Sequence, residues 1–572
     1  MNTKRMTKKN FTLPENRVYI DKVQPFVHED IEKWPIHVQY NNREEFIKQV
    51  VELTIKNASW LTKDGKTFRR ELKNILYQEK IRLTQDPWKS DDPKEKLFWK
   101  DIKKQIIASS TLEYQNDTRD VDEKILKDIL NYYGEEMTPN FKVKSYRFVQ
   151  NVLPPVYVRL MSPLKELFFN FFSSKMNFFR KMKVTGDVDH IRSLSKQGTV
   201  VVVPTHFSNL DSPTIGYSLN AIGLSAFTYG AGVNLFTLNA LSRLMNNLGA
   251  YRVDRRRKHR LYLEFLKNFS KVAILNEINS LFFPGGTRSR SGALESRLKL
   301  GLLGTTIEAQ RMNFERDLKN GKKIFIVPAT LNYHYVFEAN SLIDQHLKQV
   351  GKEEYLMDED HSSFSALKRA YKVITANAGM VVSFGPPMDV LGNIVDREGQ
   401  SFDKSGQKVE IRDYFMLNNQ LTQDSQRDQQ YTQILGEAIV EKFKTHNVVL
   451  SSHIVAFTAF QILRKRFNHF SIYEVLRLPQ DETTIPKTEF RIIFDRVRDR
   501  LIEMSENKEV LLGEEFDLPQ EELITHGIKH VGNYHDKKVL KMNRHGMIYT
   551  QSMKLLFFYH NRLTGYELEQ YI

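Results

Sequence analysis

The chain of 572 residues contains no cysteine. This absence excludes disulfide bonds, zinc sites built on thiolates, and enzymes that use a cysteine nucleophile. The first ten residues are basic, but no apolar run follows them. We therefore expect no signal peptide and no secreted disulfide scaffold.

Long hydrophobic runs are also missing. The sequence has no uncharged apolar stretch of about 18 residues or more, so a conventional membrane-spanning helix is not expected. Two segments come closest: Val448–Leu463 is apolar but short, and Pro163–Met182 is rich in Phe but carries several Lys and Arg. Both are compatible with a buried core helix. Pro163–Met182 also fits an interfacial helix with Phe on one face and basic side chains on the other.

Positive charge is abundant, with a formal net charge of +15 and a pI of about 9.4. Such a chain favours anionic partners: nucleic acid, anionic lipid or phosphorylated substrates. No helix-turn-helix, zinc or base-stacking motif accompanies the charge, so nucleic acid is not an expected partner. A hydrophobic content of 41% is enough for a large core, and the length suggests about three domains.

The chain divides into three regions by pattern. Residues 1–140 are highly charged, and apolar residues at helical spacing over Phe46–Ile55 and Phe68–Leu83 predict helices there. Tyr132–Pro155 contains several Gly and Pro and predicts a connection. A central domain follows over 150–395, and 396–572 is predicted to be mainly helical after a polar surface excursion.

Short β-branched or apolar runs that end in Pro or Gly characterise the central domain. They predict buried strands, and longer periodic segments between them, Arg260–Phe269 and Leu300–Met312, predict helices. Alternating strands and helices indicate an α/β fold with a mixed sheet covered by helices. The predicted strands are Gly198–Pro204, Ser280–Pro284, Ile324–Pro328 and Met380–Phe384.

The first chemical motif follows the strand that ends at Pro204. His206 lies in the next loop, and Asp211 or Ser212 is expected to cap a helix that has Pro213 in its first turn. A carboxylate at this spacing can hold one imidazole nitrogen while the other accepts a proton from a substrate hydroxyl. With 16 His in the chain, one such pair is expected by chance. The motif alone also fits a loop histidine beside a helix cap.

Three further segments carry charge or conformational freedom. Gly285–Gly292 combines glycines, which permit a close backbone approach, with Arg side chains and hydroxyls suited to phosphate, although a solvated turn has the same composition. Gly249–Arg260 is strongly basic; the alternative is a solvated face in which Asp254 pairs with an Arg. Val327–Tyr333 is a strand end that could form a pocket wall or simply core.

Taken in this order, the four segments resemble the motifs of the glycerolipid acyltransferase superfamily. His206 to Asp211 matches the first motif, Gly249 to Arg255 the second and Phe283 to Ser289 the third, and Val327–Tyr333 resembles the fourth. One departure is Gly285, where the family usually has Glu, a residue thought to help place the acceptor. The segments Leu450–Ala456 and Leu555–Leu563 resemble the C-terminal part of the large glycerol-3-phosphate acyltransferases.

The resemblance implies an activity and a set of roles. His206 would act as general base on a hydroxyl of glycerol 3-phosphate, and Asp211 would orient its ring. The acyl donor would be acyl-CoA or acyl carrier protein, and the reaction would be the first step of phospholipid synthesis. No metal, other cofactor or covalent acyl-enzyme is implied. Phosphate binding is assigned to Arg255, Arg288, Arg290 and Lys299, and the substrate pocket to Gly285, Gly286, Thr287, Ser289 and Pro328.

Two alternatives to this function remain at the level of sequence. The acceptor could be lysophosphatidate, or the chain could be an inactive acyltransferase-like module that binds lipid or protein; Gly285 is the only support for inactivity. The basic surface and Pro163–Met182 predict docking on an anionic membrane. We expect a membrane-associated protein on the cytoplasmic face of a bacterial inner membrane.

Overall fold

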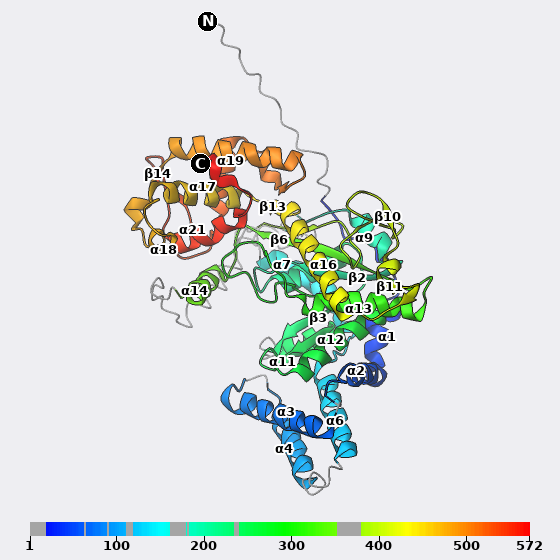
Figure 1. Cartoon of the computed structure of the whole chain (residues 1–572). Coiled ribbons are helices and arrows are strands. Elements are labelled where there is room, and N and C mark those ends of the chain that lie inside the picture. The colour runs from blue at the N-terminus through cyan, green and yellow to red at the C-terminus, as the bar shows by residue number, and fades with distance from the viewer. Residues whose placement is uncertain are drawn as a thin grey trace.

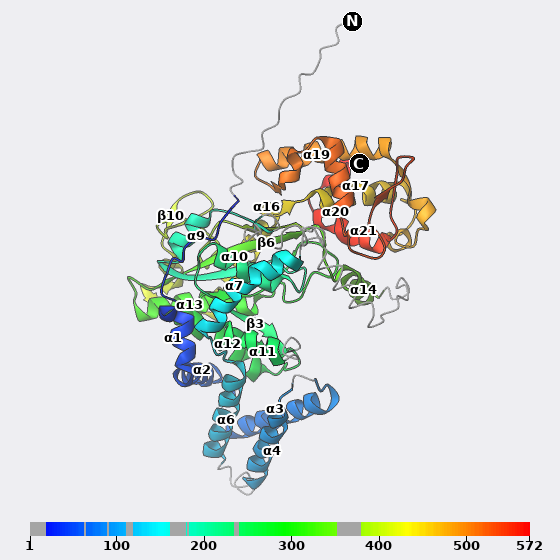
Figure 2. The ribbon, with the colours of Figure 1, turned by 180° about the vertical axis from the view of Figure 1, so that it is seen from behind.

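The computed structural model describes residues 19–61, 64–88, 91–109, 118–160, 179, 182–233, 239–351 and 379–572. Its helices and strands form three groups along one long axis (Figure 1). A sheet with its covering helices occupies the middle. Helices α3, α4 and α6 extend from one end, and α17, α19 and α21 gather at the other, as the reverse view also shows (Figure 2).

A seven-stranded sheet is the centre of the molecule, in the order β1-β7-β6-β2-β5-β3-β4. Neighbouring strands are parallel except for β6 and β7, which are antiparallel. The predicted mixed sheet of an α/β fold is therefore confirmed. The strands are β1 (Met182–Thr185), β2 (Gly198–Pro204), β3 (Thr228–Gly232), β4 (Ala250–Val253), β5 (Ser280–Leu281), β6 (Lys323–Tyr333) and β7 (Met380–Phe384).

Alternating side chains of β2 supply both faces of the sheet, because successive residues of a strand point to opposite sides. Val200 and Val202 belong to the core shared with helix α10 (Asp211–Ala221). Val201 and Val203 belong to the core on the other face. The helices of that second face are α12 (Arg260–Leu275), α13 (Leu300–Arg316) and α16 (Ser425–Thr445).

The predicted strands and helices of the central domain are largely confirmed. The first and last strands match β2 and β7, and both predicted helices are present as α12 and α13. β6 is longer than predicted, whereas β5 ends at Leu281 because the chain there already leaves the sheet for the glycine-rich loop. The strands at or next to the edges of the sheet, β1, β3 and β4, were not predicted from their short and partly polar sequences.

The N-terminal helices pack onto the central domain through a continuous core. Phe46 of α2 meets Phe269 of α12 edge to face, with 5.2 Å between the ring centroids. At the other edge of the sheet, the amide of Ile20 donates to the carbonyl of Val184 in β1. The helices are α1 (Pro35–Asn41), α2 (Arg43–Asn57), α3 (Gly65–Gln85), α4 (Pro93–Ala108), α6 (Arg119–Met137) and α7 (Val143–Leu160), which confirms those predicted over Phe46–Ile55 and Phe68–Leu83.

The connection predicted over Tyr132–Pro155 is wrong in extent, because α6 continues to Met137 and α7 begins at Val143. Gly134 is not a helix breaker here but a packing residue. A Cβ built on it would lie 2.5 Å from Cγ2 of Ile47, so the glycine lets α2 approach α6 closely. Only the short segment between the two helices is a connection.

The polar excursion after the central domain forms small hairpins, and helices follow. The hairpin strands are β8 (Ile394–Val395), β9 (Ser401–Phe402) and β10 (Lys408–Val409), then β11 (Met416–Leu417) and β12 (Gln420–Leu421). After α16 come β13 (Val448–Val449), α17 (Ser451–Arg466), α18 (Ile472–Val475), β14 (Ile485–Pro486), α19 (Lys487–Glu506), β15 (Leu511–Leu512), α20 (Gln520–His530), β16 (Lys541–Met542), β17 (Met547–Tyr549) and α21 (Met553–His560).

The two apolar segments noted in the sequence have different outcomes. Most of Val448–Leu463 lies in α17, whose side chains from Ser451 to Phe460 are all buried, so the prediction of a core helix is confirmed. Pro163–Met182 lies outside the described residues except for Phe179 and Met182. Among the helices that the structure describes, none has the length and apolar character needed to cross a membrane.

Candidate active site

His206 and Asp211 form a hydrogen-bonded pair at the carboxyl end of β2. Nδ1 of His206 lies 2.7 Å from Oδ2 of Asp211. The same carboxylate oxygen accepts the backbone N–H groups of Phe207, at 2.5 Å, and Ser208, at 2.8 Å. Because the carboxylate is fully buried and held by several donors, the geometry fixes Nδ1 as the nitrogen that carries the proton.

The local structure explains why the loop adopts this shape. β2 ends at Pro204, and α10 begins at Asp211 with Pro213 in its first turn, as predicted. The predicted cap differs, however, since Leu210 is the N-cap residue and has no side-chain hydrogen bond to the helix. The carboxylate of Asp211 turns back to the loop that precedes it, so this residue orients His206 and does not cap the helix.

A second layer holds Asp211 from the neighbouring strand. The hydroxyl of Tyr333, at the end of β6, donates to Oδ1 of Asp211 at 2.6 Å. Tyr333 is itself buried, and it ends the segment Val327–Tyr333, which resembles the fourth motif and was predicted to form a pocket wall or core. Both carboxylate oxygens therefore have donors, which hold Asp211 in place to orient His206.

The other side of the imidazole is open for chemistry. The His206 ring stacks on Phe283, with 4.1 Å between centroids, and its side chain keeps 16% of its surface exposed. Within the described part of the chain, Nε2 has no hydrogen-bond partner. An oriented imidazole with one free nitrogen at a partly exposed position is suited to act as a general base.

The glycine-rich loop packs against the His206 loop through its backbone. The amide of Ser289 donates to the carbonyl of His206 at 2.7 Å, and the Ser289 hydroxyl donates to the carbonyl of Ala293 at 2.7 Å. Ser289 thus fastens the loop. Gly286 has a φ of +74°, and the side chain of Lys299 lies across it, with Cε 2.9 Å from where a Cβ would be. Thr287 is partly exposed in the same loop.

Glu338 joins the His206 loop to the glycine-rich loop. No sequence motif predicted this role. It lies at the start of α14 (Ala339–Gln349) and accepts the Ser208 hydroxyl and the Asn209 amide, each at 2.9 Å. Its other interaction is an ion pair with Arg288, with 3.3 Å between Oε1 and Nη1. Arg288 is therefore held in place beside the catalytic loop.

The predicted phosphate-binding residues are only partly brought together. Partial desolvation and the positive charge of nearby Arg288 lower the pKa of Arg255, so these two cations lie close enough to repel each other. Lys299 lies over Gly286 in the same loop. Arg290 lies near α14: burial of His346 in that helix and then the positive charge of Arg290 lower the pKa of His346. Pro328, assigned to the pocket, is buried within β6 opposite Val203.

Most of the basic run after β4 is not a solvated face. Nη2 of Arg256 pairs with Asp254 at 2.7 Å, and Arg257 is buried, with Nη1 2.6 Å from Oε2 of Glu136 in α6. Asp254 therefore pairs with an Arg, as the alternative predicted, and the buried partners come from the N-terminal helices. Arg255 remains exposed beside this network. Carboxylates of Glu79, Asp91 and Glu95 complete the network.

The C-terminal region reaches the same loops. Nδ2 of Asn561 donates to the carbonyl of Ser291 at 2.8 Å, and the Arg562 guanidinium lies over the ring of Phe207. Both residues belong to Leu555–Leu563, the segment noted in the sequence. The sequence predicted a resemblance of this segment to other acyltransferases, but it did not predict contacts with the glycine-rich loop.

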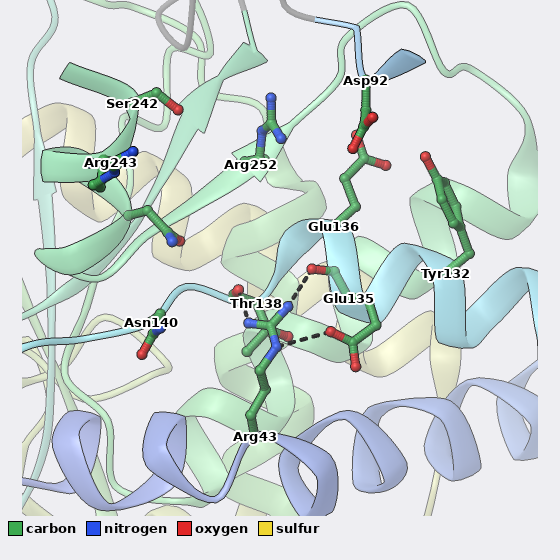
Figure 3. A pocket seen from close by; sticks show the side chains of 11 residues that line it. Arg43, Asp92, Tyr132, Glu135, Glu136, Thr138, Asn140, Ser242, Arg243 and Arg252 are labelled. Carbon is green, nitrogen blue, oxygen red and sulfur yellow. Dashed lines mark hydrogen bonds and ion pairs between the residues drawn. The ribbon is translucent and has the colours of Figure 1, made fainter. Parts of the chain in front are cut away.

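A well-formed pocket lies away from this site. It has a volume of about 590 Å³ and lies between the N-terminal helices and the β4 edge (Figure 3). Arg43 projects into it from α2 and is bound by the side chain of Glu135 and the carbonyl of Thr138, while Arg243 and Arg252 line the opposite side. None of the predicted site residues lines this pocket.

Comparison with known proteins identifies the central segment. A family model described as Acyltransferase matches residues 185–332. These residues form an acyltransferase-family domain. The matched segment contains His206, Asp211, Arg255 and the whole glycine-rich loop, so the resemblance found in the sequence is confirmed.

Curated relatives of this acyltransferase domain carry one name. A glycerol-3-phosphate acyltransferase of Pseudoalteromonas atlantica is 25% identical over 212 residues, which are 37% of this chain and 24% of the relative. One of Baumannia cicadellinicola is 27% identical over 210 residues, 36% of this chain and 24% of the relative. One of Pseudomonas fluorescens is 21% identical over 380 residues, 64% and 40% respectively. The chain thus spans about a quarter of the length of the first two relatives.

Proposed function

We propose that this protein transfers a fatty acyl group from a thioester donor, acyl-CoA or acyl carrier protein, to a hydroxyl of glycerol 3-phosphate. This would be the first step of phospholipid synthesis. The observation that carries the proposal is the buried Asp211 carboxylate, which orients His206 and leaves Nε2 free. The name shared by the curated relatives supports the choice of acceptor.

The reaction follows from the geometry of the pair. Nε2 of His206 takes the proton of the acceptor hydroxyl as the hydroxyl oxygen attacks the thioester carbonyl. A tetrahedral intermediate forms and collapses, the C–S bond breaks, and the thiolate leaves with the proton from the imidazolium. Asp211 stabilises the imidazolium between these steps. The products are an ester and a free thiol, and no covalent acyl-enzyme or metal takes part.

The phosphate of the acceptor would bind between Arg255 and Arg288. Two neighbouring guanidinium groups repel, and an anion bound by both removes this repulsion while accepting several hydrogen bonds. Arg288 is oriented by Glu338, whereas Arg255 is exposed and free to meet a ligand from solvent. Lys299 is placed to add a further positive charge beside Gly286.

We also propose that the protein associates peripherally with an anionic membrane, at the cytoplasmic face of a bacterial inner membrane. The net charge of +15 and the apolar acyl chain of the product support this location. Sedimentation with vesicles of anionic or of zwitterionic phospholipid tests it. Binding only to anionic vesicles, reversed by high salt, is expected, and no binding to anionic vesicles would contradict it.

The activity is tested with purified protein and each donor, supplied with glycerol 3-phosphate or with lysophosphatidate. We expect acyl transfer to glycerol 3-phosphate that is lost in His206→Ala and retained in His545→Ala, a matched change at an exposed histidine. Transfer only to lysophosphatidate would move the assignment to that acceptor. Donor consumption no greater than in His206→Ala would instead indicate an inactive binding module.

A further inference from the structure

The motif that the glycine-rich loop resembles usually has a glutamate where this chain has Gly285, and in this structure a carboxylate lies beside that position. It belongs to Glu295, further along the same loop. A Cβ built on Gly285 would lie 3.0 Å from Cγ and 3.2 Å from Oε1 of Glu295. The space that a side chain at 285 would enter is therefore already occupied by an acidic group.

Glu295 makes a direct contact with the catalytic loop. Its Oε1 accepts the backbone N–H of His206 at 2.7 Å. Its Oε2 is buried and, within the described residues, has no hydrogen-bond partner. A buried carboxylate oxygen without a donor is costly, so its retention beside the catalytic base calls for a functional reason.

We propose that Glu295 is a positioning residue for His206 and supplies, from a different point in the loop, the carboxylate that the family motif places at the position of Gly285. This inference rests on the proposed function, because it assigns Glu295 a part in the reaction of His206. In that role Oε1 fixes the backbone of the base by accepting the N–H of His206.

The path of the loop brings Glu295 to this place. Gly292 has a φ of +85°, and its Cα faces the carbonyl of Phe558 so closely that a side chain would clash there. The neighbouring carbonyl of Ser291 is held by Asn561. The C-terminal region thus fixes the turn from which Glu295 returns to His206, which accounts for a carboxylate at 295 in a chain with this C-terminal extension.

Gly285 and Glu295 are complementary. A glutamate at 285 would meet the Glu295 side chain at a distance that few real Cβ atoms show, and it would place a third carboxylate beside those of Asp211 and Glu295. Like charges in a buried site disfavour ionisation of both. Burial already raises the pKa of Glu295 to about 7, against the opposing effect of the hydrogen bond from His206. The site therefore accommodates one of the two glutamates.

The test is a mutant cycle of Glu295→Ala, Gly285→Glu and the double variant, with Ser296→Ala as an exposed control. We expect Glu295→Ala to lower kcat with glycerol 3-phosphate at least about tenfold, because a small displacement of the base is sufficient for such a loss. Gly285→Glu alone should also reduce activity, and the double variant should recover much of it. Glu295→Gln keeps an acceptor for the His206 amide and should retain more activity than Glu295→Ala.

An unchanged kcat in Glu295→Ala, or a double variant no more active than either single one, would overturn the inference. Wild-type protein without transfer to glycerol 3-phosphate would instead contradict the proposed function. Thermal melts of the wild type, Glu295→Ala, Gly285→Glu and the double variant then test the placement of Glu295 separately. A strongly destabilising Gly285→Glu change that becomes tolerated in Glu295→Ala supports it, and additive melting shifts contradict it.

Discussion

The guanidinium of Arg562 lies over the ring of Phe207, with 4.0 Å between its central carbon and the ring centroid. Phe207 directly follows the catalytic base, whereas Arg562 belongs to the short turn after α21. Arg562 is buried and donates to Oδ1 of Asn447 at 2.9 Å and to the carbonyl of Leu331 at 2.6 Å. The short turn after α21 is therefore part of the wall behind the catalytic pair.

Replacing Arg562 by Ala should destabilise the protein by about 2 to 4 kcal/mol. The backbone carbonyl of Leu331 and the side-chain oxygens of Asn332 and Asn447 lose the Arg562 donor. Each buried acceptor left unpaired costs about 1–3 kcal/mol, and the removal of a buried charge offsets part of this loss. Arg562→Lys should recover only part of the stability, since an ammonium cannot reproduce the planar fork. Urea denaturation measures the loss.

The matched control for Arg562 is Arg544→Ala, which removes an exposed arginine from the same C-terminal region. It should change the free energy of unfolding by no more than about 0.5 kcal/mol. If both variants unfold at the same urea concentration as the wild type, the Arg562 contacts contribute nothing to stability, and the C-terminal region does not brace the site.

Removing the Tyr333 hydroxyl tests the second layer of the catalytic pair. In Tyr333→Phe, Oδ1 of Asp211 loses its 2.6 Å donor while the ring still fills its place in the core. We expect kcat to fall about tenfold with little change in KM for the acceptor, because the hydroxyl acts on the base and not on the substrate. Tyr566→Phe removes another buried tyrosine hydroxyl, one that donates to the carbonyl of Lys444, and serves as the control. Equal kcat in all three proteins would contradict the role of Tyr333.

The central domain could be predicted from sequence because its strands are short, apolar and closed by Pro or Gly. The strands at or next to the edges of the sheet were missed because few of their residues form an apolar run; β3, for example, contains two glycines and a threonine. The extent of the connection after α6 was missed because Gly134 acts through Ile47, a neighbour that only the tertiary structure brings close. Local sequence patterns do not predict contacts between residues that are far apart in the chain.

The chemical site follows the same rule. His206, Asp211 and the glycine-rich loop lie in contiguous motifs, so sequence was sufficient to find them. Tyr333, Glu338 and Arg562 act across long sequence separations and carry no spacing signal. The basic run shows the opposite error, since charge density suggested a surface, whereas Arg257 is neutralised in the core by carboxylates of the N-terminal helices. Charge alone does not determine burial when partners come from another region.

The neighbouring cations Arg255 and Arg288 provide a test of acceptor binding. Arg255→Ala should raise KM for glycerol 3-phosphate about tenfold or more and leave kcat close to wild type, because the phosphate is bound equally in the ground and transition states. The rise in KM with added salt should also be smaller in this variant, since one screened contact is gone. Lys258→Ala, at an exposed neighbouring position, is the control. A KM that is the same in Arg255→Ala and Lys258→Ala would exclude Arg255 from phosphate binding.

The buried carboxyl of Glu295 should make stability depend on pH. Burial raises its pKa from 4.5 to about 7, so between these values the folded protein holds a proton that the unfolded chain has released. Stability therefore falls as pH rises through this window, by at most about 3 kcal/mol from this group. Glu295→Gln removes the titration and should match the wild type near pH 4.5 while being more stable near pH 8. Urea denaturation across this range gives the difference, with Glu398→Gln as the exposed control. Wild-type and Glu295→Gln curves that run parallel throughout would show that the Glu295 carboxyl ionises as easily in the folded protein as in the unfolded chain.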